Sequence, residues 1–222
     1  MNKNTIIIST IAIVVFIIVA YFLTNKPVTS NYAQIVKPRT TVSESAKIPD
    51  HLLGKGPHIL VEYSDLQCPA CKAFHEYLLE EKKKDVSFGK LLDTQYTIIY
   101  RNFPLTNIHK NAQLAAQSVE AAGMQGKFYE FLTKAFADQT TWAQSDTAKQ
   151  YFISIAKDLG LKTDQFTKDI DSADVIQKIN IDIQTGTQTN LEATPTFFID
   201  GNKVTGIGSF EDLKKLLIES AK

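Results

Sequence analysis

Two cysteines spaced three positions apart constrain most strongly what this chain can fold into. Cys68 and Cys71 are the only cysteines among 222 residues, which excludes a disulfide-stapled scaffold and a four-cysteine metal site. The β-rich run His58–Tyr63 precedes them and is bounded upstream by glycine and proline, as is typical of a buried strand. Apolar residues at helical spacing follow them. The pair is therefore predicted to lie where a buried strand passes into a helix.

This position favours redox chemistry. The unpaired N–H groups and the dipole at a helix start stabilise an anion, and thiolate is the reactive form of cysteine. Pro69 suits the first helical turn, and Cys71 lies about one turn beyond Cys68, so the two can alternate between dithiol and disulfide. Two alternatives remain. The pair could form half of a zinc site, which would need two further ligands. It could also form a static disulfide, but a disulfide that closes so short a ring would stabilise the fold weakly.

The rest of the chain alternates between strand and helix patterns. A second strand is predicted over Tyr96–Tyr100, and a strand–helix–strand unit favours parallel pairing with a right-handed crossover. Helical patterns fill about residues 107–188, and Thr196–Thr205 has the pattern of a β-hairpin. Ser209 begins a capping box for a last amphipathic helix. The predicted fold class is α/β.

The N-terminus predicts a membrane segment. Residues 6–23 form an uncharged run of 18 residues, about 27 Å long as a helix, close to the thickness of a bilayer core. The run is longer than the apolar region of a signal peptide and lacks a good cleavage site, which favours an uncleaved signal-anchor over a cleaved signal peptide. Residues 1–5 would be cytoplasmic and residues 24–50 an unpatterned extracytoplasmic linker. Either alternative exports residues 51–222 to an oxidising compartment.

The balance of charged residues argues against nucleic-acid binding. The 24 Lys and Arg residues balance 24 Asp and Glu residues, so the chain lacks the basic excess that typically marks nucleic-acid binding. No nucleic-acid partner is expected.

Three segments together resemble the DsbA family of thiol–disulfide oxidoreductases. They are Glu62–Cys71 (EYSDLQCPAC), Asn102–Leu105 (NFPL) and Ala193–Gly201 (ATPTFFIDG). The resemblance covers about residues 50–222 and is closest to the membrane-tethered, BdbD-like branch. It implies a thioredoxin-like fold with an inserted α-helical domain over about 106–190. The 123 residues between Cys71 and Pro195 leave room for that insertion.

The resemblance also implies residue roles. Cys68 would be the exposed nucleophile and Cys71 the buried resolving cysteine of a redox-active disulfide. Pro195 matches the cis-proline facing the pair, and the backbone of Thr194 would bind an extended substrate segment by strand addition. Glu62 matches a partly buried acid that exchanges a proton with Cys71. The residues between the cysteines are Pro-Ala instead of Pro-His, which predicts a less extreme oxidant.

The implied function is the introduction of disulfides into exported proteins by a membrane-anchored, extracytoplasmic enzyme. Its expected partners are exported proteins with free thiols and a membrane quinone-linked reoxidase. It is expected to be a monomer that needs no metal or organic cofactor. Two alternatives remain: an extracytoplasmic disulfide reductase or isomerase, and a copper or zinc chaperone that is not an enzyme.

Overall fold

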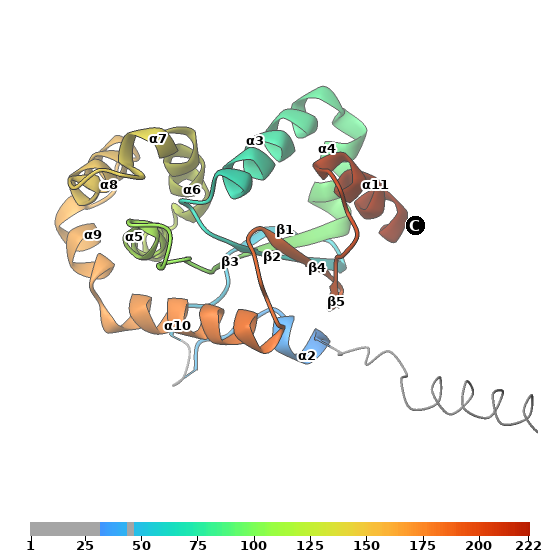
Figure 1. Cartoon of the computed structure of the whole chain (residues 1–222), viewed down its shortest axis with the longest axis horizontal. Helices are drawn as coiled ribbons and strands as arrows, with labels where there is room; N and C mark the ends of the chain where they lie inside the picture. The colour runs from blue at the N-terminus through green and yellow to red at the C-terminus, as the bar shows by residue number, and fades with distance from the viewer. Residues whose placement is uncertain (1–31, 44–46) are drawn as a thin grey trace, which may run out of the picture. The chain divides into compact units, whose positions relative to one another are not determined.

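We describe the protein from a computed structural model, which covers residues 32–43 and 47–222. These residues belong to one compact unit, Tyr32–Lys222. Within them a single sheet is formed by β1 (Leu52–Gly54), β2 (His58–Ser64), β3 (Tyr96–Asn102), β4 (Thr196–Ile199) and β5 (Asn202–Lys203). The order is β1-β3-β2-β4-β5, and only β2 and β3 are parallel among these neighbours. The predicted parallel strand–helix–strand unit is confirmed (Figure 1).

Helices join and flank these strands. Between β2 and β3 lie α3 (Pro69–Lys84) and α4 (Val86–Gln95), and α11 (Phe210–Ser220) ends the chain. Between β3 and β4 lies a helical insert at the predicted position, made of α5 (Ala112–Met124), α6 (Phe128–Ala137), α7 (Gln139–Trp142), α8 (Ala148–Asp158), α9 (Thr163–Ile170) and α10 (Ala173–Gln188). The predicted α/β fold with a helical insertion is confirmed. The sequence did not predict β1 or α4.

Alternation along the central strands divides the apolar core between the two faces of the sheet. On one face, Leu60 and Ile98 join Phe74 of α3, residues of α4 and Leu213 of α11 in one buried cluster. On the other face, Val61 and Ile99 join the buried cluster that includes Val36 and Phe198. Figure 1 shows α3, α4 and α11 on one side of the sheet and α10 on the other.

The helical insert has a core of its own. Large side chains from four of its helices are fully buried there: Phe131, Phe136, Trp142, Phe152 and Phe166. The same cluster continues to Cys71 of α3 and Tyr100 of β3. The insert therefore packs against the end of the sheet at which the cysteines lie.

Tyr32 and the short helix that follows it, which precede β1 in the chain, pack onto the sheet. Helix α2 (Ala33–Val36) buries Val36, and the Tyr32 ring packs edge-on against Phe198 with centroids 5.6 Å apart. Gly201, at φ +84°, makes room for α2, because a Cβ there would lie 2.5 Å from the Cα of Ala33. The predicted linker over 24–50 is thus wrong for its described part, because apolar contacts and buried ion pairs attach this part to the domain.

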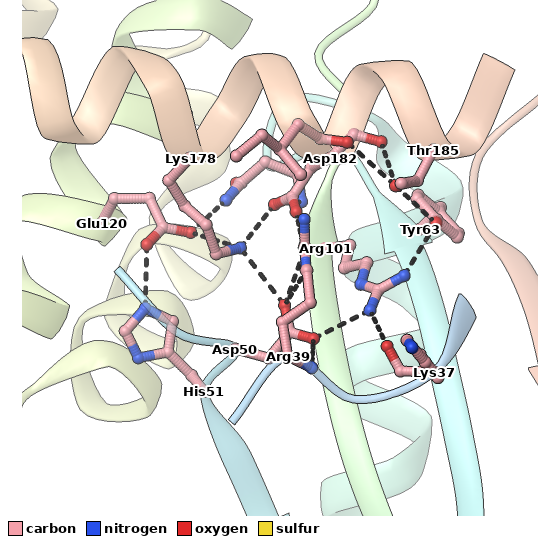
Figure 2. Close-up of polar contacts among 12 residues, drawn as sticks. Lys37, Arg39, Asp50, His51, Tyr63, Arg101, Glu120, Lys178, Asp182 and Thr185 are labelled. Atoms are coloured by element: carbon pink, nitrogen blue, oxygen red, sulfur yellow. Dashed lines mark hydrogen bonds and ion pairs between the residues drawn. The ribbon is translucent and has the colours of Figure 1, made fainter. Parts of the chain in front are cut away.

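Those ion pairs form a charge cluster, which we define as Arg39, Asp50, Arg101, Glu120, Lys178 and Asp182 (Figure 2). Asp50 accepts from Arg39 Nη2 at 2.6 Å and from Arg101 Nη2 at 2.8 Å, and Arg39 also pairs with Asp182. Lys178 Nζ lies 2.7 Å from Asp182 and 3.5 Å from Glu120. Burial alone raises the pKa of Asp50, but Lys178, Arg101 and Arg39 hold that pKa well below its ordinary value.

The predicted transmembrane segment, residues 6–23, lies outside the described residues, as do residues 1–5. Among the helices of residues 32–43 and 47–222, none combines the length and the apolar character that crossing a bilayer requires.

Candidate active site

Cys68 lies at the junction of β2 and α3, as the sequence predicted. It is the N-cap residue of α3, its carbonyl accepts from Lys72 N at 3.1 Å, and Pro69 occupies the first turn. Both cysteines are free thiols in this structure. Cys68 is 8% exposed and Cys71 is fully buried. The prediction of an exposed Cys68 is therefore wrong, because the loop before β4 lies against its sulfur. Cys68 is nevertheless less buried than Cys71.

The surroundings of Cys68 favour its thiolate. Hydrogen bonding from the Cys71 side chain is the largest influence. Together with backbone groups in the first turn of α3 and the Thr194 side chain, it outweighs burial and lowers the pKa of Cys68 to about 5. In the thiol form, Sγ donates to the carbonyl oxygen of Thr194 at 3.4 Å. At neutral pH Cys68 is mainly thiolate, which is a good leaving group in disulfide exchange.

Cys71 has the opposite character. Burial raises its pKa well above the ordinary value, and the neighbouring Cys68 and Glu62 raise it further. The Asp65 N–H points to Cys71 Sγ at 3.5 Å and acts in the other direction. Cys71 therefore holds its proton at neutral pH and supports the Cys68 thiolate with a hydrogen bond.

Beneath Cys71 lie three buried polar side chains on one face of the sheet, which we call the Glu62 group: Glu62, Ser64 and Tyr100. Burial raises the pKa of Glu62 to about 7, and Ser64 acts in the opposite direction without outweighing it. No well-directed hydrogen bond within the described residues reaches Glu62 Oε1, Ser64 Oγ or the Tyr100 hydroxyl. A carboxyl group that titrates near neutral pH beside a buried thiol can take up or release that thiol's proton.

The loop before β4 faces the cysteines from the other side of the site. The Thr194–Pro195 peptide bond is cis, and the Thr194 carbonyl accepts from Cys68. Pairing of β4 with β2 begins at Thr196, opposite Tyr63. The structure thus brings together all five residues that the sequence singled out, from two segments far apart in the chain.

A sequence model of the thioredoxin family matches residues 48–219, which is most of the chain. The chain belongs to the thioredoxin family. The chain shares its fold with solved structures of BdbD and of DsbA proteins, which confirms the predicted resemblance to the DsbA family. BdbD from Bacillus subtilis superposes with a TM-score of 0.65 at 22% identity, covering 78% of this chain and 92% of BdbD. The thiol-disulfide exchange protein α-DsbA2 from Wolbachia pipientis gives a TM-score of 0.62 at 20% identity, covering 77% of this chain and 87% of α-DsbA2.

Similarity to curated sequences extends to parts of much longer proteins. The Na⁺/H⁺ antiporter NhaA 1 of Mycobacterium sp. (strain KMS) is 34% identical over 161 residues, covering 71% of this chain and 24% of the antiporter. The NhaA antiporter of Herminiimonas arsenicoxydans is 31% identical over 161 residues, covering 71% of this chain and 23% of that protein. The chain therefore spans about a quarter of the length of these relatives.

Sequence reasoning missed the residues that hold the thioredoxin-family redox loop, which we define as Asp65–Cys68. Gln67 donates from Nε2 to the Ala143 carbonyl at 2.7 Å and accepts from the Asn111 N–H at 2.7 Å. Gln139 donates from Nε2 to the carbonyls of Leu66 and Cys68, at 2.7 and 3.1 Å. These partners lie in the insert or the loop that enters it, and no local sequence pattern marks them.

His75 does not compensate for the missing histidine between the cysteines. Its ring is partly buried against Phe136, and Nε2 lies 3.0 Å from Thr133 Oγ1. Burial lowers the pKa of His75 to about 4, so it is neutral at pH 7. Within residues 32–43 and 47–222, no group of three or more His, Cys, Asp or Glu is arranged to hold a metal ion.

Proposed function

We propose that this protein is a thiol–disulfide oxidoreductase that introduces disulfides into exported proteins from a membrane-anchored, extracytoplasmic position. The observation that carries the proposal is the contrast between the two cysteines. Cys68 has a pKa lowered to about 5, whereas burial raises that of Cys71 well above its ordinary value. The family and the fold of solved thiol–disulfide exchange proteins support it.

The reaction starts from the oxidised Cys68–Cys71 pair. A substrate thiolate attacks Cys68 Sγ, a mixed disulfide forms, and Cys71 leaves as a thiolate that takes a proton from Glu62. The second thiolate of the substrate then attacks the substrate sulfur of the mixed disulfide. Cys68 leaves as a stable thiolate, the substrate keeps the new disulfide, and the enzyme is reduced by two electrons.

The stable Cys68 thiolate favours disulfide donation over reduction. A low pKa in the leaving thiol speeds its departure and stabilises the reduced enzyme, which makes the oxidised enzyme a stronger oxidant. Turnover then requires a partner that removes two electrons from the reduced pair. We propose a membrane quinone-linked reoxidase, in keeping with a domain attached to the membrane by residues 6–23.

The test is to trap the mixed disulfide. In Cys71→Ala, substrate adducts through Cys68 are expected to accumulate on cells that express the full chain, and reductant should release them. The matched control Cys68→Ala keeps one buried thiol and should trap at most a trace. A folded Cys71→Ala protein without adducts would contradict the proposal. Stoichiometric binding of Cu⁺ or Zn²⁺ to the reduced wild type, without disulfide exchange, would instead favour a metal chaperone.

A further inference from the structure

We propose that Asp65 and His109 form a latch that positions the redox loop and stabilises the reduced state of the cysteine pair. The proposal rests on the proposed function for its importance in exchange, but its geometry is independent of it. Asp65 precedes Cys68 by three residues, and His109 lies in the loop between β3 and α5. We treat both as positioning residues, because Asp65 contacts the cysteines through its backbone and His109 acts through Asp65.

Asp65 connects the two cysteines through its backbone. Its N–H points to Cys71 Sγ at 3.5 Å, and its carbonyl oxygen accepts from the Cys68 N–H at 3.0 Å. A small rotation of the Asp65 peptide would therefore change the surroundings of both sulfurs at once.

The Asp65 side chain fixes that backbone. The residue is 2% exposed, and its Oδ1 accepts from the Gln67 N–H at 2.7 Å within the same loop. Its Oδ2 accepts from the Leu105 N–H at 2.9 Å and lies 2.7 Å from His109 Nδ1. Because an ionised carboxylate only accepts hydrogen bonds, Nδ1 of His109 is the donor. Two of these three donors belong to a different loop, so the carboxylate joins the redox loop to the entrance of the helical insert.

The partners of Asp65 also explain why a buried negative charge is tolerated beside a thiolate. No lysine or arginine in the described ranges pairs with Asp65, and its side-chain partners there are the N–H groups of Gln67, Leu105 and His109. Three directed N–H donors therefore satisfy the carboxylate. Without the His109 donor, the Asp65 carboxylate would be better solvated if it turned toward solvent. The Asp65 peptide would then rotate with its side chain.

The latch therefore acts on Cys68 through Cys71. The Asp65 N–H orients Cys71 Sγ, and hydrogen bonding from Cys71 is in turn the largest influence that favours the Cys68 thiolate. Loss of the latch is expected to destabilise the dithiol form more than the disulfide form. The protein would then hold its own disulfide more tightly and become a weaker oxidant.

The test compares His109→Ala with His109→Asn, because the Asn side-chain NH₂ can take the place of Nδ1 as donor. Equilibration with glutathione buffers is expected to shift about tenfold toward the protein disulfide in His109→Ala, equivalent to about 30 mV. His109→Asn should recover most of this shift. The matched control His75→Ala removes another partly buried histidine, one bonded to Thr133, and should leave the equilibrium constant within about twofold of wild type.

Two further measurements separate positioning from a structural role. Unfolding of the oxidised and reduced forms should show a larger loss in the reduced form of His109→Ala, whereas a structural role lowers both equally and would overturn the proposal. Ultraviolet titration of the Cys68 thiolate in the reduced protein should show a higher midpoint in His109→Ala. Because this titration needs no exchange activity, an inactive wild type would refute the proposed function only, and an unchanged midpoint and potential would refute the latch.

Discussion

Tyr100 and Arg101 are neighbours on β3, but their side chains lie on opposite faces of the sheet. The buried carboxyl groups on the two faces differ in whether they have cationic partners. Tyr100 pairs in register with Glu62 and belongs to the Glu62 group, whose carboxyl has no cationic partner among the described residues. Arg101 pairs in register with Tyr63 and belongs to the charge cluster, where every carboxylate contacts at least one cation (Figure 2).

The difference shows how one fold treats buried acids in two ways. In the charge cluster the neighbouring cations outweigh burial and lower the pKa of Asp50 and Glu120. The ion pairs and hydrogen bonds of the cluster hold α10 and the described residues before β1 to the sheet. In the Glu62 group, burial without a cation raises the pKa of Glu62 to about 7. The first arrangement fixes a structure, whereas the second keeps a proton available beside Cys71.

The largest effect is expected from breaking the charge cluster. Lys178→Met should lower the free energy of unfolding by about 3–5 kcal/mol, because it leaves buried carboxylates without one of their cations. Urea unfolding measures this loss, and Lys168→Met on the exposed side of α9 is the control. The Cys68 thiolate titration should not change. A loss below about 1 kcal/mol would mean that the cluster does not stabilise the fold as we describe.

Much of the fold could be predicted from local patterns, whereas the charge cluster could not. The β-rich run at His58 and the hairpin after Pro195 have strong period and turn signals. Helix α4 contains Gly89 and begins one residue after the charged end of α3, and its short apolar pattern gives no clear helix signal. Members of the charge cluster come from separate elements between Arg39 and Asp182, and each alone resembles a surface residue.

In the candidate site, too, some residues could be identified from the sequence and others could not. Cys68, Cys71 and Pro195 lie in short motifs and could be identified from the sequence. Asp65 lies inside one of those motifs, but its role depends on His109, which is 44 residues away. Contacts across such a separation have no local signal, so the latch becomes visible only in the fold.

The next prediction concerns Glu62, the buried acid without a cationic partner among the described residues. Wild-type stability should fall as pH rises from about 4.5 to about 7, because the unfolded state releases the Glu62 proton first and the folded state holds it until pH 7. Glu62→Gln removes this loss, so its stability relative to wild type should rise by about 3 kcal/mol between pH 4 and pH 9. The exposed control Glu219→Gln should show little change. A constant difference across this pH range would contradict the raised pKa of Glu62.

Glu62→Gln should also slow the exchange step in which Cys71 leaves, because Gln cannot supply a proton. The expected loss is about a hundredfold near pH 7, at the lower end of the range for general acid catalysis. Stopped-flow reduction of the oxidised protein by a small thiol measures it. Equal rates for the variant and the wild type would remove Glu62 from the mechanism.

The smallest effects on stability are expected from removing one tyrosine hydroxyl on each face of the sheet. The Tyr63 hydroxyl accepts from Arg101 Nη1 at 3.0 Å and donates to Thr185 Oγ1 at 2.9 Å. Tyr63→Phe should therefore cost about 1–2 kcal/mol. The Tyr100 hydroxyl is buried without a well-directed bond, so Tyr100→Phe should be neutral or stabilise by up to about 1 kcal/mol. Equal losses in urea unfolding would show that the two faces are satisfied alike.

The antiparallel pairing of β2 with β4 has a consequence for how the protein reaches its native state. It places Leu60 opposite Ile199 across the whole length of the insert. Closing so long a loop costs chain entropy that the contact can offset only after the intervening helices have become compact. Assembly of the site should therefore come late. Until β4 arrives, a newly made chain exposes its two thiols without the loop that covers them.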